Sequence, residues 1–414
     1  MRILEPMHDR DLYSTILGIR PPWFVDDVKV SASDEEVRVH LAIDTDAGLR
    51  CPLCDAASPR YDARHRSWRH LDTCQFRTIL EADVPRVQCA EHGVHLVKVP
   101  WAEPGSRFTA LFECLAIDWM KEASISAVAR RLRVSWDQLE VIRFRAVRRG
   151  LARRKPETLR RIGVDETSFQ KRHEYVTIVS DLDRPRVIHV GDDRDQSSLD
   201  YFFETLSDEE RAAIEVVALD MWEPYIRSIR QHVPDASKKL CFDKFHVAMH
   251  LGNAVDKVRR QEHRELLGRG DGRLKGTKHL WLQNPDNMSE PRWKRLKAIS
   301  RCSLRVARAW AVKETAMTLW DYSRRGWARR AWTTLVRWTR RFRMEPVRVV
   351  GRMIESHLEG ILNAIVHGVT SALSESFNAT IQWIKKMACG YRNRDRFRVA
   401  IYFHLGGLDL YPRP

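Results

Sequence analysis

The sequence predicts a multidomain α/β protein that contains a zinc ribbon, a helix-turn-helix and a mixed-sheet domain interrupted by an all-helical insertion. Three observations lead to this prediction. Cys51-x-x-Cys54 and Cys89-x-x-His92 follow strand-like runs near the N-terminus. Residues 121–150 read as a short basic helical hairpin. Between residues 161 and 247, three strand signals in succession precede an αβαβ order, which is typical of a mixed sheet.

Composition narrows the class of partner. The 414 residues include 71 Lys and Arg against 55 Asp and Glu, a formal net charge of +16. So basic a chain favours a polyanionic partner, most often nucleic acid. No run approaches the roughly 18 apolar residues that a membrane span needs, and the N-terminus lacks a signal-peptide core. We expect a soluble intracellular protein. Its eight cysteines are unevenly spaced and four of them lie within residues 51–89, which favours metal binding over disulfides.

Residues 1–100 form the predicted zinc-ribbon domain. Residues 25–43 alternate as a β-hairpin, and residues 77–89 form a further strand that Cys89 closes. Two residues between ligands let a tight knuckle present both to a tetrahedral zinc, and four ligands leave no open position, so the role is structural. Cys74 and His95 are spare candidates. The alternative is that some of these residues are buried free cysteines. The predicted ligands are Cys51, Cys54, Cys89 and His92.

Residues 101–155 form the predicted helix-turn-helix. Val128, Ala129 and Leu132 mark a first helix, and Leu139 and Ile142 belong to a second after a turn at Arg-Val-Ser. In such a motif the second helix enters the major groove. Its arginines suit phosphate contacts. The alternative is an ordinary helical hairpin with a solvated basic face. The arginines assigned to DNA are Arg143, Arg145, Arg148 and Arg149.

The mixed-sheet domain is predicted to comprise residues 156–250 and 366–414. Its helical insertion, residues 251–365, interleaves tryptophans with arginines. We expect most of these tryptophans to fill the insertion's core and the arginines together to contact DNA. The tryptophans are Trp310, Trp320, Trp327, Trp332 and Trp338, and the arginines are Arg324, Arg325, Arg329, Arg330, Arg337, Arg340 and Arg341.

Two aspartates carry the strongest chemical signal. Asp165 lies within the strand Arg-Ile-Gly-Val-Asp-Glu-Thr, and Asp220 ends the apolar run Glu-Val-Val-Ala-Leu-Asp. A carboxylate on a buried strand costs desolvation free energy unless it has a metal or a hydrogen-bond partner. On neighbouring strands, the two predict a shared divalent-metal site suited to in-line phosphodiester chemistry. The alternative is that each is a cap or turn residue.

Glu375 is a candidate third carboxylate, in the stretch SALSESFNATIQWIKKMACGYRN of residues 371–393. As a helix, this stretch gathers Phe377, Ile381 and Ile384 on an apolar face, with Glu375, Asn378, Gln382 and Lys386 on the other. No Lys or Arg follows Glu375 at three or four residues, so an intrahelical ion pair does not account for it. The alternative is a first-turn acid that favours the helix dipole, with Ser371 or Ser374 as the cap.

Four stretches together resemble a known family. GVDETSF, ALDMWEPYI, CFDKFHV and SESFNATIQWIKKMACGYRN occur in the order seen in bacterial insertion-sequence transposases of the ISL-three family, and the resemblance covers nearly the whole chain. It implies a DDE transposase with an RNase H-like catalytic core. Asp165, Asp220 and Glu375 then correspond to the catalytic triad that holds Mg²⁺ or Mn²⁺.

The resemblance also extends to the residues around the triad. Asp243 and His246 look like the D-x-x-H motif beside the active site of several transposase groups, with a strand-end turn and a structural His as the alternative. Glu166 follows Asp165 directly, and strand alternation is expected to point it away, in a supporting or structural role. Lys385, Lys386 and Arg392 become expected DNA contacts.

The expected activity is therefore metal-dependent cleavage at insertion-sequence ends and strand transfer to target DNA. The expected partners are double-stranded DNA, as terminal inverted repeats and target, and further copies of the chain in a homodimer or larger multimer. A cytoplasmic, nucleoid-associated bacterial protein is implied, without membrane contact. The alternatives are a structure-specific RNase H-like nuclease without strand transfer, and a non-enzymatic zinc and helix-turn-helix DNA-binding regulator.

Overall fold

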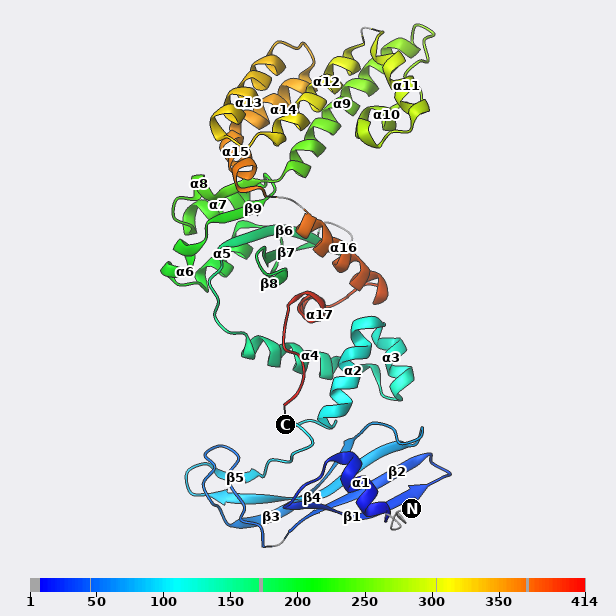
Figure 1. The fold of residues 1–414 in the computed structure, drawn as a ribbon, viewed down its shortest axis with the longest axis vertical. Coiled ribbons are helices and arrows are strands. Elements are labelled where there is room, and N and C mark those ends of the chain that lie inside the picture. Colours follow the sequence, from blue (N-terminus) through cyan, green and yellow to red (C-terminus); the bar gives the residue numbers. More distant parts are fainter. Residues whose placement is uncertain (1–7, 45, 171–173, 303, 370–371, 414) are drawn as a thin grey trace, which may run out of the picture. The chain divides into compact units, whose positions relative to one another are not determined.

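The computed structural model describes residues 8–44, 46–170, 174–302, 304–369 and 372–413 (Figure 1). The chain forms two compact units. The first comprises Met1–Lys155, Tyr402–His404 and Leu408–Pro414, and the second Pro156–Ile401 and Leu405–Gly407. The last residues of the chain therefore pack with the N-terminal unit, whereas the sequence led us to expect all of 366–414 in the mixed-sheet domain.

The first unit opens with a five-stranded sheet of order β1-β2-β4-β3, with β5 paired to β4. The predicted hairpin and the strand closed by Cys89 are present, but β3 was not predicted because its sequence, RYDARHRSWR, is almost entirely polar. Trp101 packs edge-on against Trp23 and Trp68 in the core, with ring centroids 4.9 and 5.3 Å apart. The elements are α1 (Asp9–Leu17), β1 (Trp23–Ser31), β2 (Glu36–Ile43), β3 (Arg60–Arg69), β4 (Arg77–Cys89) and β5 (Gly93–Leu96).

Three helices complete the first unit: α2 (Ala110–Glu122), α3 (Ile125–Leu132) and α4 (Trp136–Arg153). The tight turn between α3 and α4 follows from the sequence. Arg133 adopts a left-handed conformation with φ of 54°, which ends α3. Ser135 then begins α4 with a capping box shared with Gln138. The predicted helix-turn-helix is thus formed by α3 and α4.

The second unit contains a sheet of order β10-β9-β6-β7-β8. The first three strands in sequence pair antiparallel, whereas β9 runs parallel to β6, and β10 runs parallel to β9. This is the mixed RNase H-like arrangement that the sequence predicts. β10 is shorter than expected because a helix starts two residues after it. The strands are β6 (Arg161–Gln170), β7 (Glu174–Asp181), β8 (Arg186–Asp192), β9 (Val216–Leu219) and β10 (Leu240–Phe242).

Helices pack against this sheet. Val164 of β6 lies in one core with Leu199 of α5 and Tyr225 of α7. From the same strand, Asp165 and Thr167 bond to side chains of α16. Because successive side chains of a strand point to opposite faces, α16 and α7 use different sides of β6. The helices are α5 (Gln196–Glu204), α6 (Asp208–Ala213), α7 (Glu223–His232), α8 (Ala236–Lys239), α16 (Ala372–Met387) and α17 (Arg394–Leu405).

The helical insertion follows the sheet with almost no connecting loop. Its first helix, α9, begins at Lys244, two residues after the end of β10, and is 24 residues long. Trp332 is fully buried there, and only Trp327 of the five predicted tryptophans is mostly exposed, at 56%. No helix in the described part of the chain is both long and apolar enough to cross a membrane. The helices are α9 (Lys244–Leu267), α10 (Lys278–Leu282), α11 (Glu290–Ser300), α12 (Arg305–Thr318), α13 (Arg325–Arg340), α14 (Glu345–Ser356) and α15 (Leu358–His367).

Candidate active site and metal centres

Strand register aligns three aspartates across neighbouring strands of the second sheet, at the point where β9 and β10 end. β6 pairs with β9 up to Gly163 opposite Ala218, and β9 pairs with β10 up to Leu219 opposite Phe242. Continuing these registers sets Asp165 opposite Asp220, and Asp220 opposite Asp243. Directly paired residues of neighbouring strands point to the same face, with their strands about 4.8 Å apart.

Burial perturbs the two predicted catalytic aspartates. Burial is the largest cause that raises the pKa of Asp165 to about 6, and the charge of Asp220 also raises it. The hydrogen bonds that Asp165 accepts, and the charge of His246, act in the opposite direction and lower this pKa. Burial also raises the pKa of Asp220. His246, the hydrogen bond from the Trp222 N–H and Arg194 lower it, but they do not cancel the effect of burial. Two partly buried carboxylates that repel each other favour a bound cation between them. The donor set, carboxylate oxygens only, fits a hard divalent ion.

Each aspartate is also held in position by hydrogen bonds. The backbone N–H of Glu166 donates to Oδ1 of Asp165 at 2.8 Å, and Nδ2 of Asn378 donates to Oδ2 of Asp165, also at 2.8 Å. The backbone N–H of Trp222 donates to Oδ1 of Asp220 at 3.1 Å. The orientation of both carboxylates is therefore fixed by the protein itself.

Helix α16 presents its polar side to β6. Besides the Asn378 bond, Nε2 of Gln382 donates to the Thr167 hydroxyl at 3.4 Å, and Nζ of Lys385 donates to the Ser168 carbonyl at 2.6 Å. Glu375 lies three residues before Asn378, which places it one turn away on the same side of the helix. Of the two predicted caps, Ser374 lies inside α16, and Ser371 lies outside the described residues.

Glu166 lies in the same electrostatic environment as the aspartates, although alternation turns it toward the other face. Burial raises its pKa to about 7, and the charges of Asp220 and Asp165 add to the rise. Nη1 of Arg194 contacts its Oε1 at 3.1 Å. Arg194 is held over the Trp222 ring at 4.1 Å and the Tyr175 ring at 4.8 Å. Sequence reasoning missed Arg194, because a lone arginine after a strand carries no pattern.

Asp243 and His246 both lie where α9 begins, but they occupy different positions there. Asp243 is buried and begins α9 as its N-cap, its Oδ1 accepting from the Phe245 N–H at 3.0 Å. His246 lies in the first turn of α9, where its electrostatic interaction lowers the pKa of both Asp165 and Asp220. His250, four residues on, also lowers that of Asp220.

The four predicted zinc ligands gather in the first unit. Their ligand atoms all lie within 4.8 Å of one another. Sγ of Cys54 is 3.7 Å from Sγ of Cys89, and Nδ1 of His92 is 3.6 Å from the latter. Hydrogen bonds from the His92 backbone and ring lower the pKa of Cys89 to about 6, which favours the thiolate that binds zinc. The spare candidates Cys74 and His95 are outside this cluster.

Comparison with known proteins agrees with this geometry. Residues 162–401 match the ISL3 DDE model, described as a transposase. Residues 97–142 match the helix-turn-helix domain of transposase family ISL3, and residues 48–92 match the zinc-finger of transposase IS204/IS1001/IS1096/IS1165. The first match alone spans more than half of the chain. The chain belongs to the ISL3 family of transposases.

Two relatives match along most of their length. The transposase for insertion sequence element IS1557 of Mycobacterium tuberculosis is 28% identical over 419 residues, with 94% of this chain and 93% of the relative covered. The transposase for insertion sequence element IS1001 of Bordetella parapertussis is 26% identical over 358 residues, with 85% and 88% covered. The family match and the Cys/His cluster together assign a structural zinc to this transposase.

The structure corrects the role expected for most of the arginines in α4. Arg143 is 3% exposed and pairs with Glu140. Arg149 is also buried and pairs with both Glu103 and Glu113, at 2.6 and 2.7 Å. Arg145 reaches the same two glutamates at 3.5 and 3.6 Å. These three arginines hold the first unit of the transposase together instead of facing phosphate, whereas Arg148 is exposed.

The three cations expected near Glu375 also differ in their surroundings. Lys385 is used within the transposase by its bond to Ser168, and burial lowers its pKa. Lys386 and Arg392 are exposed.

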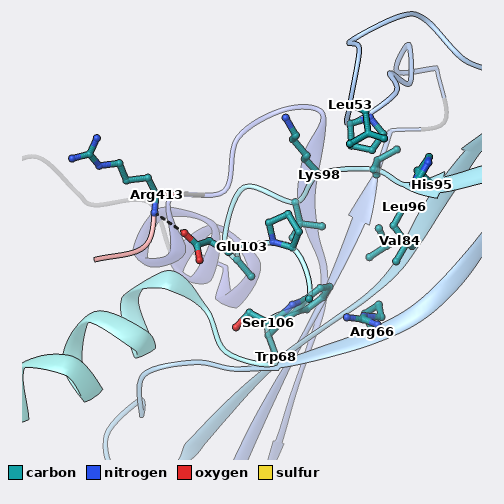
Figure 2. A pocket seen from close by; sticks show the side chains of 16 residues that line it. Leu53, Arg66, Trp68, Val84, His95, Leu96, Lys98, Glu103, Ser106 and Arg413 are labelled. Atoms are coloured by element: carbon teal, nitrogen blue, oxygen red, sulfur yellow. Dashed lines mark hydrogen bonds between the residues drawn. The ribbon is translucent and has the colours of Figure 1, made fainter. Parts of the chain in front are cut away.

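A cavity of about 740 Å³ lies in the first unit beside the zinc knuckle (Figure 2). Leu53, Trp68 and Val84 contribute apolar surface, and Arg66 and Lys98 stand at its wall. Arg413 also lines the cavity, and its backbone N–H donates to Glu103 at 3.4 Å. This cavity could not be predicted from the sequence, because its lining comes from segments far apart in the chain.

Proposed function

We propose that this transposase cuts DNA at the ends of its insertion sequence and joins those ends to target DNA, using Asp165, Asp220 and Glu375 to hold divalent metal. The observation that carries the proposal is the Asn378 bond to Asp165, which brings the Glu375 helix onto the strand opposite Asp220. When bound, Mg²⁺ or Mn²⁺ would lower the barrier by stabilising charge on the attacking and leaving oxygens.

In the proposed reaction, water attacks the phosphorus in line, the P–O3′ bond breaks, and a free 3′-hydroxyl leaves. That hydroxyl then attacks a target phosphodiester, so that one P–O bond forms as another breaks and no protein–DNA covalent link is made. Asn378 and the Trp222 N–H keep Asp165 and Asp220 oriented throughout. Lys386 and Arg392, exposed on and just beyond α16, are proposed to contact the phosphates that flank the reacting bond.

The first unit is proposed to recognise the element ends through the zinc ribbon and the α3–α4 helix-turn-helix, with Arg148 on phosphate. Because two ends are joined in one event, we propose at least a dimer on DNA. We also propose that the protein acts at the bacterial nucleoid, because its DNA substrate is located there.

The rival functions predict different products. A nuclease with the same core cuts but does not join, and a regulator does neither. Incubating the full-length protein with duplexes that carry the inverted repeats flanking its gene, a target plasmid, and Mg²⁺ or Mn²⁺ separates the three. We expect cleaved ends and joined products from the unaltered protein, and neither product from Asp220→Asn or Glu375→Gln.

Glu204→Gln, an exposed residue of α5, makes the same chemical change away from the site and is expected to keep full activity. Cleavage without joined products would favour the nuclease. Activity retained in Asp220→Asn would overturn the metal-site assignment.

A further inference from the structure

Helix α13 of the insertion carries a row of exposed side chains, which we name the α13 stripe: Trp327, Arg330, Thr334, Arg337 and Arg341. Successive members are three or four residues apart, so they follow one face of the helix, and Arg341 caps its C-terminal end. Figure 1 places α13 beside α14 within the helical insertion. None of these residues takes part in the sites described above.

The arginines of the α13 stripe differ from the other arginines of this helix in their ion pairing. Within the part of the chain that the structure describes, no carboxylate forms an ion pair with Arg330, Arg337 or Arg341. The helix dipole favours cations in the last turn of a helix, and this effect can account for unpaired arginines at Arg337 and Arg341. It does not account for Arg330, which lies nearer the start of the helix. Placing Arg337 and Arg341 four residues apart costs about 0.2–0.5 kcal/mol of repulsion that a glutamate would have relieved.

Other arginines of the same helix are paired. Arg325 and Arg329 both contact Glu359, at 2.8 and 2.6 Å, and Arg340 contacts Glu355 at 2.6 Å. These partners lie on α14 and α15, so one side of α13 is neutralised against the rest of the insertion. Acidic residues of α14 and α15 therefore neutralise these three arginines, whereas the structure shows no such partner for the stripe arginines among the residues it describes.

Trp327 adds a second unusual feature. It is 56% exposed although tryptophan is rarely so, and the Arg330 guanidinium lies 5.3 Å from its ring centroid. Stacking on a ring restricts the guanidinium without using its hydrogen-bond donors, so Arg330 keeps them available for an anion.

We infer that the α13 stripe binds the phosphate backbone of duplex DNA. Arg330 and Arg341 are eleven residues apart, which is about 16 Å along a helix at 1.5 Å per residue, comparable to about five base steps of 3.4 Å. Arginine contacts to phosphate carry no sequence information, so this surface grips DNA of any sequence. The inference rests on the proposed function only in taking duplex DNA as the substrate.

Fluorescence anisotropy with a labelled 40-base-pair duplex of mixed sequence tests it, using full-length protein without divalent metal, over a range of salt concentrations. The triple variant Arg330→Gln, Arg337→Gln, Arg341→Gln is expected to bind at least about tenfold more weakly, with the slope of log K against log salt reduced by about 2 to 3. The charge-matched control is Arg295→Gln, Lys297→Gln, Arg301→Gln, exposed positions on and after α11 that share no single face.

Unchanged affinity and slope in the stripe variant would overturn the inference, and so would an equal loss in the α11 control, which would mark a general effect of charge. Sedimentation velocity without DNA tests the competing occupant, a second copy of the chain: a changed oligomeric state with unchanged DNA binding also overturns it. Glu375→Gln should bind the duplex normally, so failure of the catalytic proposal and failure of this one give different results.

Discussion

Asn378 of α16 donates a 2.8 Å hydrogen bond to Oδ2 of Asp165 on β6, a contact between residues 213 apart in the sequence. This bond joins the two parts of the catalytic unit that the helical insertion separates. It also occupies one oxygen of a partly buried carboxylate, whose pKa is raised to about 6 by desolvation. The position of α16, and hence of Glu375, is therefore tied to the carboxylate it is proposed to assist.

Replacing Asn378 with Ala should slow cleavage while leaving the fold intact. Loss of a hydrogen-bond partner behind a metal ligand typically costs 10- to 100-fold, and we expect a reduction on the order of 10- to 100-fold in single-turnover cleavage rate here. Gln382→Ala is the matched control, because Gln382 makes a longer bond, of 3.4 Å, to a hydroxyl that is not a proposed ligand. Equal losses in both variants would show that general docking of α16 matters and not the orientation of Asp165.

Arg194 is predicted to act by positioning its neighbours. Its guanidinium contacts Glu166 and stacks on Trp222, whose backbone N–H holds Asp220. Arg194→Gln should therefore reduce cleavage by about 10- to 100-fold. Because the lost charge leaves Glu166 without its cation, adding Glu166→Gln should restore part of the activity that Arg194→Gln alone loses.

This double-mutant cycle separates charge from packing. A double variant as impaired as the sum of the two singles would contradict the electrostatic role, and Arg194 would then act through its stacking on Trp222 alone. Arg184→Gln, a substitution of another partly exposed arginine of the same sheet region, serves as the control for loss of charge.

The parts of the fold that follow from local pattern were predictable from the sequence. β4 alternates buried and less buried residues along Arg77–Cys89, and β9 is a short apolar run that ends next to Asp220. β3 was missed because Trp68 is its one large apolar anchor, and its remaining polar residues alternate without a hydrophobic signal. Periodicity reports burial, so a polar edge strand leaves little trace in it.

The arginines of α4 show where sequence reasoning stops. Arg149 looks like a solvated cation in a basic helix, but Glu103 and Glu113 lie 46 and 36 residues earlier and meet it only in the folded unit. The same holds for Arg194 and Glu166, which are 28 residues apart. A charge that is paired over long range cannot be told from a free one without the structure, and this distinction decides which arginines are available to DNA.

Zinc binding should depend on Cys54 and not on Cys74. Cys54 belongs to the four-residue cluster, whereas Cys74 lies in a turn outside it. After purification with zinc and extensive dialysis, Cys74→Ser should retain one zinc per chain by elemental analysis, and Cys54→Ser should retain almost none. Because a structural zinc contributes to folding, limited proteolysis should cut the first unit of Cys54→Ser faster. Full zinc content in Cys54→Ser would refute the ligand assignment.

Stability of the first unit should fall as the pH drops below 6.5, partly through His70. Burial lowers the pKa of this histidine to about 4, and its Nδ1 lies 2.9 Å from the hydroxyl of Thr109, which also caps α2 by accepting from Phe112. The unfolded chain, with an ordinary pKa near 6.5, binds the proton more readily than the folded one. The stability contributed by neutral His70 is therefore complete above pH 6.5 and is lost as the pH falls toward 4.

His70→Asn tests this in thermal unfolding followed at pH 7.5, 6.0 and 5.0. At pH 7.5 the variant should be less stable by about 1–3 kcal/mol, because a buried hydrogen bond is lost. The difference from the unaltered protein should shrink steadily toward pH 5.0, since only the unaltered protein loses the contribution of a neutral His70. His8→Asn, a change at an exposed histidine of the same unit, should give a curve parallel to that of the unaltered protein. A gap between His70→Asn and the unaltered protein that stays constant with pH would mean that the fold accepts the charged imidazole, and the assignment of a neutral buried ring would be wrong.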